Sequence, residues 1–471
     1  MTSPTVTYEN LLATVTDPEG RVISDPATGA EVGRVRCQLV SELDAAIARA
    51  RAAQPGWAAR TDEERAALHL RAADAIEAAS EPLAELLSRE QGKPLNGPNA
   101  RFEVGACAAW LRSAATTPLP GETVVDDDTA HAELRYRPLG VVGAIGPWNW
   151  PMMITVWQVA PALRMGNTAV VKPSEYTPLS VLALVEVLNS ALPQDILRVV
   201  AGAGELGARL ASHPEIDKVM FTGSTRTGQA VIKGSADTVK RLTLELGGND
   251  AGIVLPDVDP RAIAQDLFWG AFINTGQTCA AMKRLYVHTD VYEQVCAALV
   301  EVAAAMPMGR GLDEANVLGP LQNRRQFDIV AGLVDAARAA GATLLTGGDP
   351  DLAAPGNFYP LTLVADIDND NPLVTEEQFG PALPIIRYDD VEQAIAMANA
   401  LDVGLGASVW TSDRTTARAI ATRLEAGTVW INSHGGLDPR VPFGGTKKSG
   451  YGLEFGTEGL KAVAAPQIIN G

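Results

Sequence analysis

Residues 141–175 read VVGAIGPWNWPMMITVWQVAPALRMGNTAVVKPSE. The apolar run at 141–145 has the length of a buried strand and ends in Gly-Pro-Trp-Asn, and residues 154–164 can form a helix. The run at 168–171 is a second candidate strand, which ends in Lys-Pro-Ser-Glu. A strand, a helix and a strand in this order predict two parallel strands joined by a right-handed crossover, and therefore an α/β fold.

The same alternation continues along the chain. Further strands are predicted at 196–200, 218–221 and 241–246, with helices at 179–191 and 206–212 between them. Each strand ends in a turn that contains Gly, Ser or Asn. Because ligands of open parallel sheets lie beyond the carboxyl ends of the strands, these turns predict one shared binding edge.

A second run of alternating elements covers residues 248–448 and predicts a second α/β domain. Its candidate strands lie at 251–254, 284–287, 342–346, 383–388, 407–410 and 428–432. Outside this domain, residues 41–92 are predicted to form helices. Residues 120–138 read as a two-stranded excursion, and the apolar tail at 462–469 is also strand-like. Each could pair with another subunit or pack on its own chain.

Length and charge limit the class of protein. A chain of 471 residues is too long for one ordinary core, so two or three domains are expected. The net charge of -18, from 38 basic and 56 acidic side chains, argues against binding nucleic acid or an anionic membrane. The first residues lack the pattern of a targeting signal, and the most apolar stretch is too short to span a bilayer, so a cytoplasmic location is expected.

The four cysteines have different surroundings. Their spacing fits neither a zinc site nor a disulfide framework, and the five histidines are scattered, so no metal site is predicted. Cys107 and Cys296 lie on apolar helical stretches, which is typical of packed thiols. Cys279 follows a Gly-Gln-Thr turn among small residues, which leaves room for a nucleophile. With Glu245 and Asn149 it suggests covalent thiol chemistry on a carbonyl.

A nucleotide site is indicated by two turns. Residues 221–228, FTGSTRTG, follow a predicted strand and begin a predicted helix. The backbone N–H groups of such a turn and the helix N-terminus favour binding of a pyrophosphate. A plain strand-to-helix turn without a ligand has the same sequence pattern. Lys172 and Glu175 end another strand and could hold ribose hydroxyls, or form a surface salt bridge. A carboxylate there repels a 2′-phosphate, so NAD is favoured over NADP.

Seven blocks carry a family resemblance. In chain order they are PWNWP (147–151), KPSE (172–175), FTGST (221–225), LELGGN (244–249), GQTC (276–279), EEQFGP (376–381) and PFGGTKKSG (442–450). They resemble the signature blocks of the aldehyde dehydrogenase superfamily, over nearly the whole chain. Relatives that pass an acyl group to coenzyme A usually lack the glutamate at the position of Glu245, so the resemblance is to the hydrolytic type.

The resemblance implies a fold, an assembly and a reaction. It implies a Rossmann-like NAD-binding domain at 1–119 and 139–247, a catalytic α/β domain at 248–448, and a small β oligomerisation arm and tail at 120–138 and 449–471. The implied assembly is a homodimer or homotetramer. Cys279 would attack an aldehyde, Asn149 and the Cys279 backbone N–H would stabilise the oxyanion, and Glu245 would activate water to release the acid.

The cofactor and substrate positions carry over in the same way. The implied NAD-binding residues are Ile145, Trp148, Lys172, Ser174, Glu175, Gly204, Phe221, Gly223, Ser224, Leu246, Glu377 and Phe379. The implied substrate tunnel holds Ile154, Trp157, Phe272 and Thr278, with Arg440 at its mouth. The tunnel aromatics and Phe379 could equally be core residues, and Arg440 could be a solvated side chain or could recognise an anionic substrate.

Two departures from the family pattern affect proton transfer. Gln158 stands where the family often has lysine, and Leu453 stands where it often has arginine, although Glu454 is retained. A proton relay through that lysine is therefore in doubt. Two other functions remain open, a cofactor-independent thiol hydrolase and a redox-inactive structural or sensor protein. The former leaves Lys172 and Gly223 unexplained, and the latter leaves Cys279 unexplained.

Overall fold

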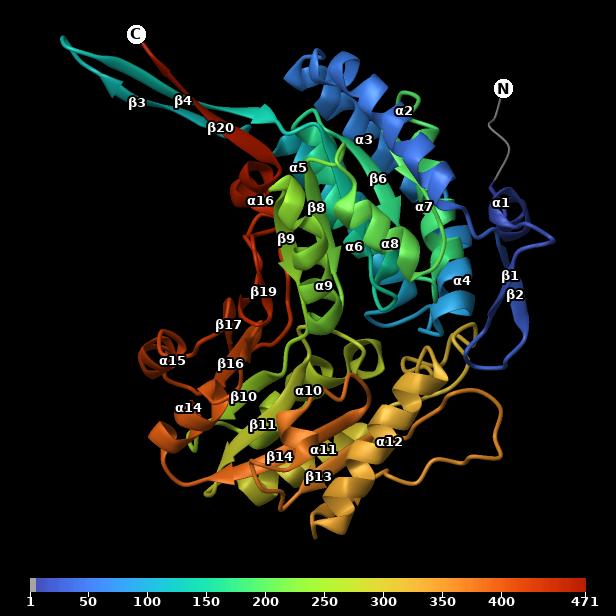
Figure 1. Ribbon diagram of the computed structural model, residues 1–471. Coiled ribbons are helices and arrows are strands. Elements are labelled where there is room, and N and C mark those ends of the chain that lie inside the picture. The colour runs from blue at the N-terminus through green and yellow to red at the C-terminus, as the bar shows by residue number, and fades with distance from the viewer. Residues whose placement is uncertain (1–5) are drawn as a thin grey trace.

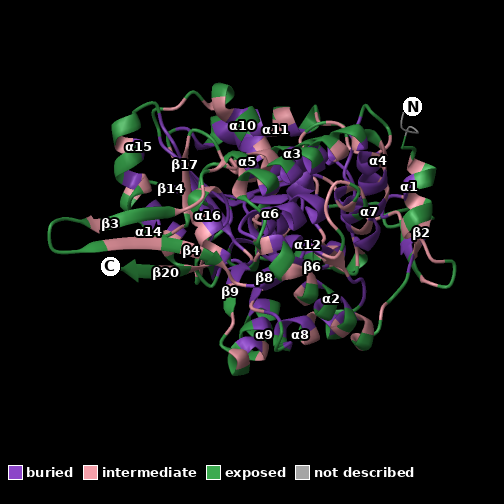
Figure 2. Ribbon diagram, turned by 90° about the horizontal axis from the view of Figure 1, so that it is seen from above, coloured by how far each residue is buried: buried purple, intermediate pink, exposed green. Residues whose placement is uncertain are grey.

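The computed structural model describes residues 6–471 and shows two stacked α/β regions with a projecting arm (Figure 1). Each region contains a largely parallel sheet, of six and seven strands respectively. The predicted α/β fold with parallel sheets is therefore confirmed. Figure 2 shows the buried residues concentrated in the body of the molecule, whereas the arm is mostly exposed or half-buried.

The first sheet contains the strands predicted from residues 141–246. Its order is β19-β9-β8-β5-β6-β7, and β5 to β9 are parallel, whereas β19 is antiparallel to β9. The strands are β5 (Val141–Ile145), β6 (Thr168–Lys172), β7 (Leu197–Val199), β8 (Lys218–Thr222), β9 (Arg241–Glu245) and β19 (Gly450–Tyr451). All residues of β5, β6 and β8 are buried, which explains their continuous apolar runs.

Helices cover both faces of this sheet. They are α2 (Val40–Ala58), α6 (Pro151–Arg164), α7 (Pro178–Asn189), α8 (Gly204–Ser212) and α9 (Thr225–Ser235), with a short 3-10 turn η1 (Ala236–Thr238). The helices α2, α8 and α9 pack on the face that carries Val141 and Ile145. The helices α6 and α7 share a core with Ala144 of the opposite face. The alternating direction of strand side chains thus builds two cores on one sheet.

The N-terminal segment adds more helices and a hairpin beside this region. These elements are α1 (Tyr8–Val15), α3 (Asp62–Ala78), α4 (Ser80–Gln91), α5 (Ala100–Thr116), β1 (Arg21–Ser24) and β2 (Glu31–Val35). The helix α3 begins with a capping box, in which Thr61 and Glu64 each satisfy a backbone N–H of the other. The helix α5 packs against α3, α4 and α6, so it connects the N-terminal helices to the sheet.

The second sheet has the order β12-β13-β14-β11-β10-β16-β17, and only the β12–β13 pair is antiparallel. Its strands are β10 (Asp250–Val254), β11 (Met282–His288), β12 (Thr343–Thr346), β13 (Thr362–Ala365), β14 (Ala382–Tyr388), β16 (Gly406–Trp410) and β17 (Thr428–Ile431). The strand β13, all of whose residues are buried, was not predicted from the sequence.

Helices and short pieces complete this second region. They are α10 (Pro260–Phe272), η2 (Ile273–Gly276), α11 (Tyr292–Ala304), α12 (Arg324–Ala339), α13 (Pro372–Thr375), α14 (Val391–Asn399) and α15 (Arg414–Ala421). The two-residue strands β15 (Val403–Gly404) and β18 (Thr446–Lys447) pair with each other. Because β19 follows β18 closely and pairs with β9, this stretch of chain joins the second region to the first sheet.

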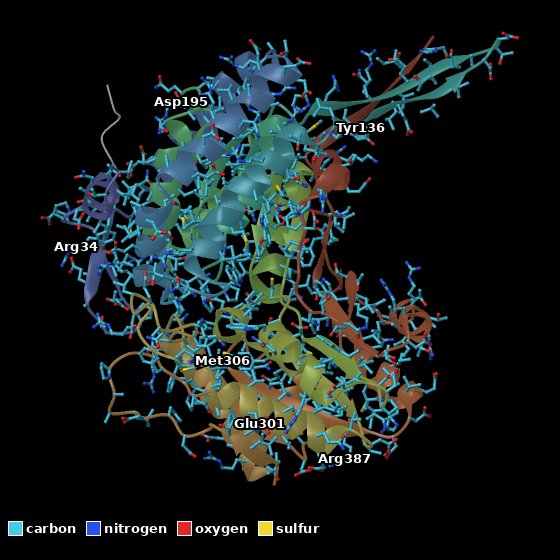
Figure 3. All side chains as sticks on the ribbon, turned by 180° about the vertical axis from the view of Figure 1, so that it is seen from behind. Arg34, Tyr136, Asp195, Glu301, Met306 and Arg387 are labelled. Atoms are coloured by element: carbon cyan, nitrogen blue, oxygen red, sulfur yellow. The ribbon has the colours of Figure 1, made fainter. Side chains whose placement is uncertain are left out.

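The arm consists of β3 (Gly121–Asp126), β4 (His131–Pro138) and β20 (Ala464–Asn470), with α16 (Gly456–Ala462) at its base (Figure 1). The strand β20 pairs with β4 along its whole length, from Ala464 opposite Pro138 to Asn470 opposite Ala132. Residues 120–138 and the C-terminal tail, each of which could have paired with another subunit, therefore pair with each other in one chain. Tyr136, labelled in Figure 3, lies where the arm joins the body.

Candidate active site

A cleft of about 680 Å³ opens at the carboxyl ends of β5, β6, β8 and β9. The turns after these strands line it together with loops from the second region, so the strand-end turns do share one edge. All predicted catalytic and cofactor residues line this cleft: Ile145, Trp148, Asn149, Lys172, Ser174, Glu175, Gly204, Phe221, Gly223, Ser224, Glu245, Leu246, Cys279, Glu377 and Phe379. A volume of this size is in the range of cofactor and substrate sites.

Two helices begin beside the cleft and bring backbone N–H groups to it. Ser224 caps α9, and its side chain accepts a hydrogen bond from the N–H of Thr227 at 3.3 Å. Gly204 is the first residue of α8. Since helix N-termini favour negative charge, this edge suits the phosphates of a dinucleotide.

The residues of α8 that line the cleft are small. They include Gly204, Gly207 and Ala208, and within residues 6–471 a methyl group added at Gly204 or Gly207 would meet no atom within 4 Å. The surface can therefore accept a flat ring. Gly207 and Ala208 were missed from the sequence, although small residues at positions i, i+3 and i+4 of a helix were an available signal.

A strained loop carries Cys279 to the cleft. Asn274, Thr275 and Gly276 have φ values of +50°, +57° and +76°, and a left-handed non-glycine residue typically costs about 1 kcal/mol or more. A side chain at Gly276 would come within 2.3 Å of the carbonyl oxygen of Gly380, so the two loops are in close contact. The surrounding structure holds the loop in this conformation and leaves Cys279 only half-buried.

Lys283 contacts the loop that carries Cys279. Its ammonium group donates hydrogen bonds to the carbonyl oxygens of Thr278 and Cys279, at 2.6 and 2.8 Å, and its side chain is 2% exposed. Burial raises the pKa of the Cys279 thiol to about 12, while the charge of Lys283 lowers it and that of Glu245 raises it. The lysine therefore favours the thiolate in an environment that otherwise opposes it. Sequence reasoning missed Lys283.

Glu377 and Phe379 belong to a neighbouring loop that lines the same cleft. The ammonium of Lys283 lies 3.6 Å from Oε1 of Glu377 and 5.5 Å from the centre of the Phe379 ring. Phe379 has a φ of +48° and packs edge-on against Trp148. Burial raises the pKa of Glu377, and Lys283 lowers it. Contacts with Trp148 and the nearby Lys283 accompany a backbone conformation that non-glycine residues rarely adopt.

Asn149 is hydrogen-bonded to the loop that carries Cys279. Its side-chain Nδ2 donates to the carbonyl oxygen of Gln277 at 2.9 Å, and Nδ2 of Asn274 donates to the carbonyl oxygen of Asn149 at the same distance. In addition, Nε1 of Trp150 donates to Oγ1 of Thr278 at 2.9 Å. The turn after β5 and the loop of Cys279 are therefore fixed relative to each other.

Glu245 ends β9 and is buried at the wall of the cleft. The residue is 5% exposed, both carboxylate oxygens are buried, and neither has a hydrogen-bond partner among the residues that the structure describes. Burial raises its pKa well above the usual value, and the nearby Glu454 raises it further. A carboxylate with a raised pKa and no partner is suited to accept a proton near neutral pH.

Glu454 has a buried lysine, Lys218, near it. This lysine does not occupy the position after Trp157, where the family often has one and this chain has Gln158. Burial raises the pKa of Glu454 to about 8, and Lys218 opposes this shift. Lys218 lies on β8, and its ammonium donates to Oγ1 of Thr243 at 2.7 Å. Gln158 instead donates from Nε2 to Oγ1 of Thr222 at 3.1 Å. The positive charge near Glu454 therefore comes from the sheet and not from α6.

An aromatic cluster belongs to the large hydrophobic core of the first region. Trp157 lies 5.5 Å from Trp110 and 4.8 Å from Phe455 between ring centres, and Phe443 stacks on Phe455 at 6.1 Å. Cys279 is in contact with the hydrophobic core that holds these rings. Nε1 of Trp110 and Nε1 of Trp157 are buried, and within the described chain neither has a hydrogen-bond partner. Trp110, Phe443 and Phe455 were not selected from the sequence.

The other predicted tunnel residues lie in different surroundings. Ile154 belongs to the same core as Trp157, whereas Phe272 packs against Phe268, with the two rings tilted, in the core of the second region. Arg440 is exposed, and its Nε donates to Oδ1 of Asp438 at 2.8 Å. The structure thus gathers the cofactor residues into one cleft but places the five predicted tunnel residues in several environments.

The described residues contain neither a metal-ligand cluster nor a helix that could span a membrane. Across residues 6–471, no three His, Cys, Asp or Glu side chains are grouped in a way that could hold a metal ion. None of the helices that the structure describes has both the length and the apolarity needed to cross a membrane.

Comparison with known proteins gives a consistent result. A family model described as the aldehyde dehydrogenase family matches residues 16–469. The chain is 39% identical to the aldehyde dehydrogenase LUC3 of a Fusarium species, over 94% of each chain. It is 38% identical to the phenylacetaldehyde dehydrogenase of Pseudomonas fluorescens, over 93% of this chain and 90% of that protein. The NAD+ complex of an aldehyde dehydrogenase from Bacillus cereus superposes with a TM-score of 0.91 at 36% identity, covering 96% of this chain and 92% of that one.

Proposed function

The chain belongs to the aldehyde dehydrogenase family, and from this premise we propose that it oxidises an aldehyde to the carboxylate with NAD through a thioester on Cys279. The observation that carries the proposal is that Cys279, Asn149 and Glu245 open onto one cleft together with the strand-end turns. A thiol, an amide donor and a carboxylate of raised pKa are the groups that acylation and deacylation require.

The cleft fits a dinucleotide. We assign the adenine ring to the small residues of α8, the phosphates to the N-terminus of α9 after Ser224, and the ribose hydroxyls to Lys172 and Glu175. Glu377 and Phe379 would hold the nicotinamide end, beside Cys279. When bound, the nicotinamide supplies the acceptor for the hydride that leaves the substrate carbon.

The first half of the reaction forms the thioester. Cys279 gives its proton to water in the cleft, and its sulfur attacks the aldehyde carbon, which places a negative charge on the former carbonyl oxygen. One N–H of the Asn149 amide donates to Gln277, so its second N–H can donate to this oxyanion. Such a donor typically contributes about 3 kcal/mol to lowering the barrier. When the carbon–oxygen double bond re-forms, hydride leaves and an acyl group remains on the sulfur.

The second half releases the acid. Glu245 takes a proton from a water molecule, whose oxygen attacks the thioester carbon, and the carbon–sulfur bond then breaks to return the Cys279 thiolate. The burial of Glu245 supports this role, because a carboxylate whose pKa is raised by burial is a stronger base than a fully exposed one. Lys283 stabilises the returning thiolate by its charge.

NAD is proposed over NADP because Glu175 lines the cleft beside Lys172. The charge of Glu175 also raises the pKa of Lys172, which burial lowers. The carboxylate can accept hydrogen bonds from ribose hydroxyls, and it would repel a 2′-phosphate.

An apolar aldehyde is the proposed substrate class. Cys279 contacts the core that contains Trp157, Phe443 and Phe455, so the body of the substrate would meet aromatic faces. The likeness to a phenylacetaldehyde dehydrogenase is consistent with this class.

A homodimer or homotetramer is the proposed assembly. The arm exposes apolar side chains, among them Val124 and Ile468, at 59% and 58%. Exposed apolar strands of this kind are typical of surfaces that pair with another chain. The expected measurement is a sedimentation mass of at least two chains. A cytoplasmic location remains a prediction.

The function is tested by measuring NADH and acid release with aliphatic, aromatic, semialdehyde and amino-aldehyde substrates, using NAD and NADP. Cys279→Ala should abolish NADH formation while NAD still binds, because only the nucleophile is lost. Cys296→Ala is the matched control, since this cysteine is buried on α11 in the second region. Normal turnover by Cys279→Ala would disprove the mechanism.

A further inference from the structure

A buried ion pair lies behind Asn149 and is not used by the steps above. Lys93 lies in the loop after α4, and Glu103 lies on α5. Both side chains are 0% exposed, and Nζ of Lys93 lies 2.6 Å from Oε2 of Glu103. Replacing such a pair by apolar side chains is often neutral for stability, so its presence calls for another explanation.

Lys93 contacts the segment that carries the oxyanion donor. Its ammonium donates to the carbonyl oxygen of Asn149 at 2.7 Å and lies 3.5 Å from the centre of the Trp150 ring. Because Nδ2 of Asn274 also donates to this carbonyl oxygen, the peptide group after Asn149 is held by two donors. One of them, Asn274, belongs to the strained loop before Cys279, and the other belongs to the N-terminal segment.

Glu103 holds the residues that follow Asn149. Its second oxygen, Oε1, accepts hydrogen bonds from the backbone N–H groups of Met152 and Met153, at 2.9 and 3.1 Å. These N–H groups belong to the first turn of α6, which has no acceptors within the helix for them. One carboxylate oxygen therefore binds the lysine and the other fixes the start of the helix.

We propose that Lys93 and Glu103 are positioning residues for the oxyanion donor. Together they fix the backbone from Asn149 to Met153, so that the amide of Asn149 is aimed before substrate binds. Neither residue lines the cleft described above, so both act through Asn149 and not on the substrate. The inference rests on the proposed function, because it requires Asn149 to stabilise an oxyanion.

The geometry predicts a specific kinetic defect. A donor displaced by about 1 Å can cost up to a hundredfold in rate, because the hydrogen bond is needed at the position of the oxyanion. Aldehyde and NAD would still bind, since their contacts lie elsewhere in the cleft. The loss should therefore appear in the rate of the first turnover, with little change in KM for the aldehyde or in Kd for NAD.

The test is a double-mutant cycle on the full-length protein. The rate of the NADH burst is measured for Lys93→Met, Asn149→Ala and the double variant, with Kd for NAD and Tm as further readouts. Lys93→Met should slow the burst by about tenfold or more, but in the Asn149→Ala background it should change the rate less than about twofold. A role in folding alone would slow both backgrounds by the same factor, and that result would overturn the proposal.

Two variants keep the result decisive. Glu103→Gln keeps an acceptor for the N–H groups of α6 but removes the ion pair, so it replaces Lys93→Met in the cycle if the latter does not fold. Arg164→Met is the matched control, because Arg164 is 2% exposed at the other end of the same helix and donates to the carbonyl oxygen of Ala114 at 3.0 Å. It should lower Tm and leave the burst rate unchanged.

The outcomes separate this inference from the proposed function. If the unchanged protein gives no NADH burst with any aldehyde, the proposed function fails. If the unchanged protein gives a burst and Lys93→Met gives the same rate, only the positioning role fails.

Discussion

The two sides of Cys279 are built from different kinds of structure. On the cofactor side, turns such as that of Gly223 and Ser224 follow the strands of one sheet and present backbone groups to the cleft. On the aromatic side, Trp110, Trp157 and Phe455 come from two helices and a loop that are distant in sequence. The first side is fixed by sheet topology, whereas the second depends on how side chains pack.

The two sides also differ in charge. The cofactor side contains ionisable groups near Cys279: Lys283 and Glu245 are buried, and Glu377 is partly buried. The aromatic side presents rings and two indole N–H groups, those of Trp110 and Trp157, which have no acceptor in the described part of the chain. We infer that the charged side sets the reactivity of Cys279, and that the aromatic side selects the aldehyde.

Glu245→Gln should have the largest effect and should separate the two halves of the reaction. Loss of a general base typically costs about 10²- to 10⁴-fold, so the steady-state rate at neutral pH should fall by that factor. The first NADH burst should persist or become faster, because the charge of Glu245 raises the pKa of Cys279. Stopped-flow NADH absorbance checks both, and an unchanged steady-state rate would remove Glu245 from the role of base.

Lys283→Met tests whether the charged side controls the thiol. Because Lys283 lowers the pKa of Cys279, its loss should raise that pKa and reduce the fraction of thiolate. Each unit of pKa corresponds to about a tenfold loss of thiolate below the pKa. The measurement is the rate of Cys279 alkylation by iodoacetamide from pH 7 to 10. A pH profile identical to that of the unchanged protein would show that the lysine acts only through its hydrogen bonds to the loop.

The difference between the sides also explains what sequence reasoning could achieve. Gly223 and Glu175 follow predicted strands directly, so their place at one edge follows from the parallel topology. Lys283 is only four residues from Cys279, but its role depends on its ammonium reaching back to the carbonyl groups of that loop. Phe272 is an aromatic residue at a position that the family resemblance assigns to the tunnel. However, α10 packs so that its ring contacts Phe268 in the core of the second region. Pattern predicts positions along strands better than it predicts which face of a helix reaches a site.

Glu175→Gln should change the choice of cofactor. Removing one negative charge near the ribose should lower KM for NADP by about fivefold or more, since two charges at contact distance interact by about 1 kcal/mol or more. KM for NAD should change less, because an amide still accepts a hydrogen bond from ribose. Kinetics with both cofactors at low ionic strength check this. No gain with NADP would mean that Glu175 does not face the ribose.

Glu454→Gln should shift the pH dependence of deacylation. The charge of Glu454 raises the pKa of Glu245, so its removal should lower that pKa and move the acidic limb of kcat to lower pH. The effect requires Glu454 to be ionised, and its own pKa is about 8, so the shift should be clearest toward alkaline pH. Thr243→Val is a neutral comparison, because it removes the hydrogen bond from Lys218 without removing a carboxylate. If the acidic limb of kcat lies at the same pH in the unchanged protein, Glu454→Gln and Thr243→Val, the coupling between Glu454 and Glu245 is contradicted.

Arg440→Ala should have the smallest effect, because Arg440 is exposed and already paired with Asp438. Arg440 pairs with Asp438, whose pKa it lowers to about 2, so both groups are charged at neutral pH and neutralise each other. A guanidinium already paired at an exposed site contributes little to binding an anion. We therefore expect kcat/KM for a neutral aldehyde and for a carboxylate-bearing semialdehyde to change by less than about twofold. A selective loss with the semialdehyde alone, reproduced by Arg440→Gln, would instead place Arg440 at the entrance to the substrate site.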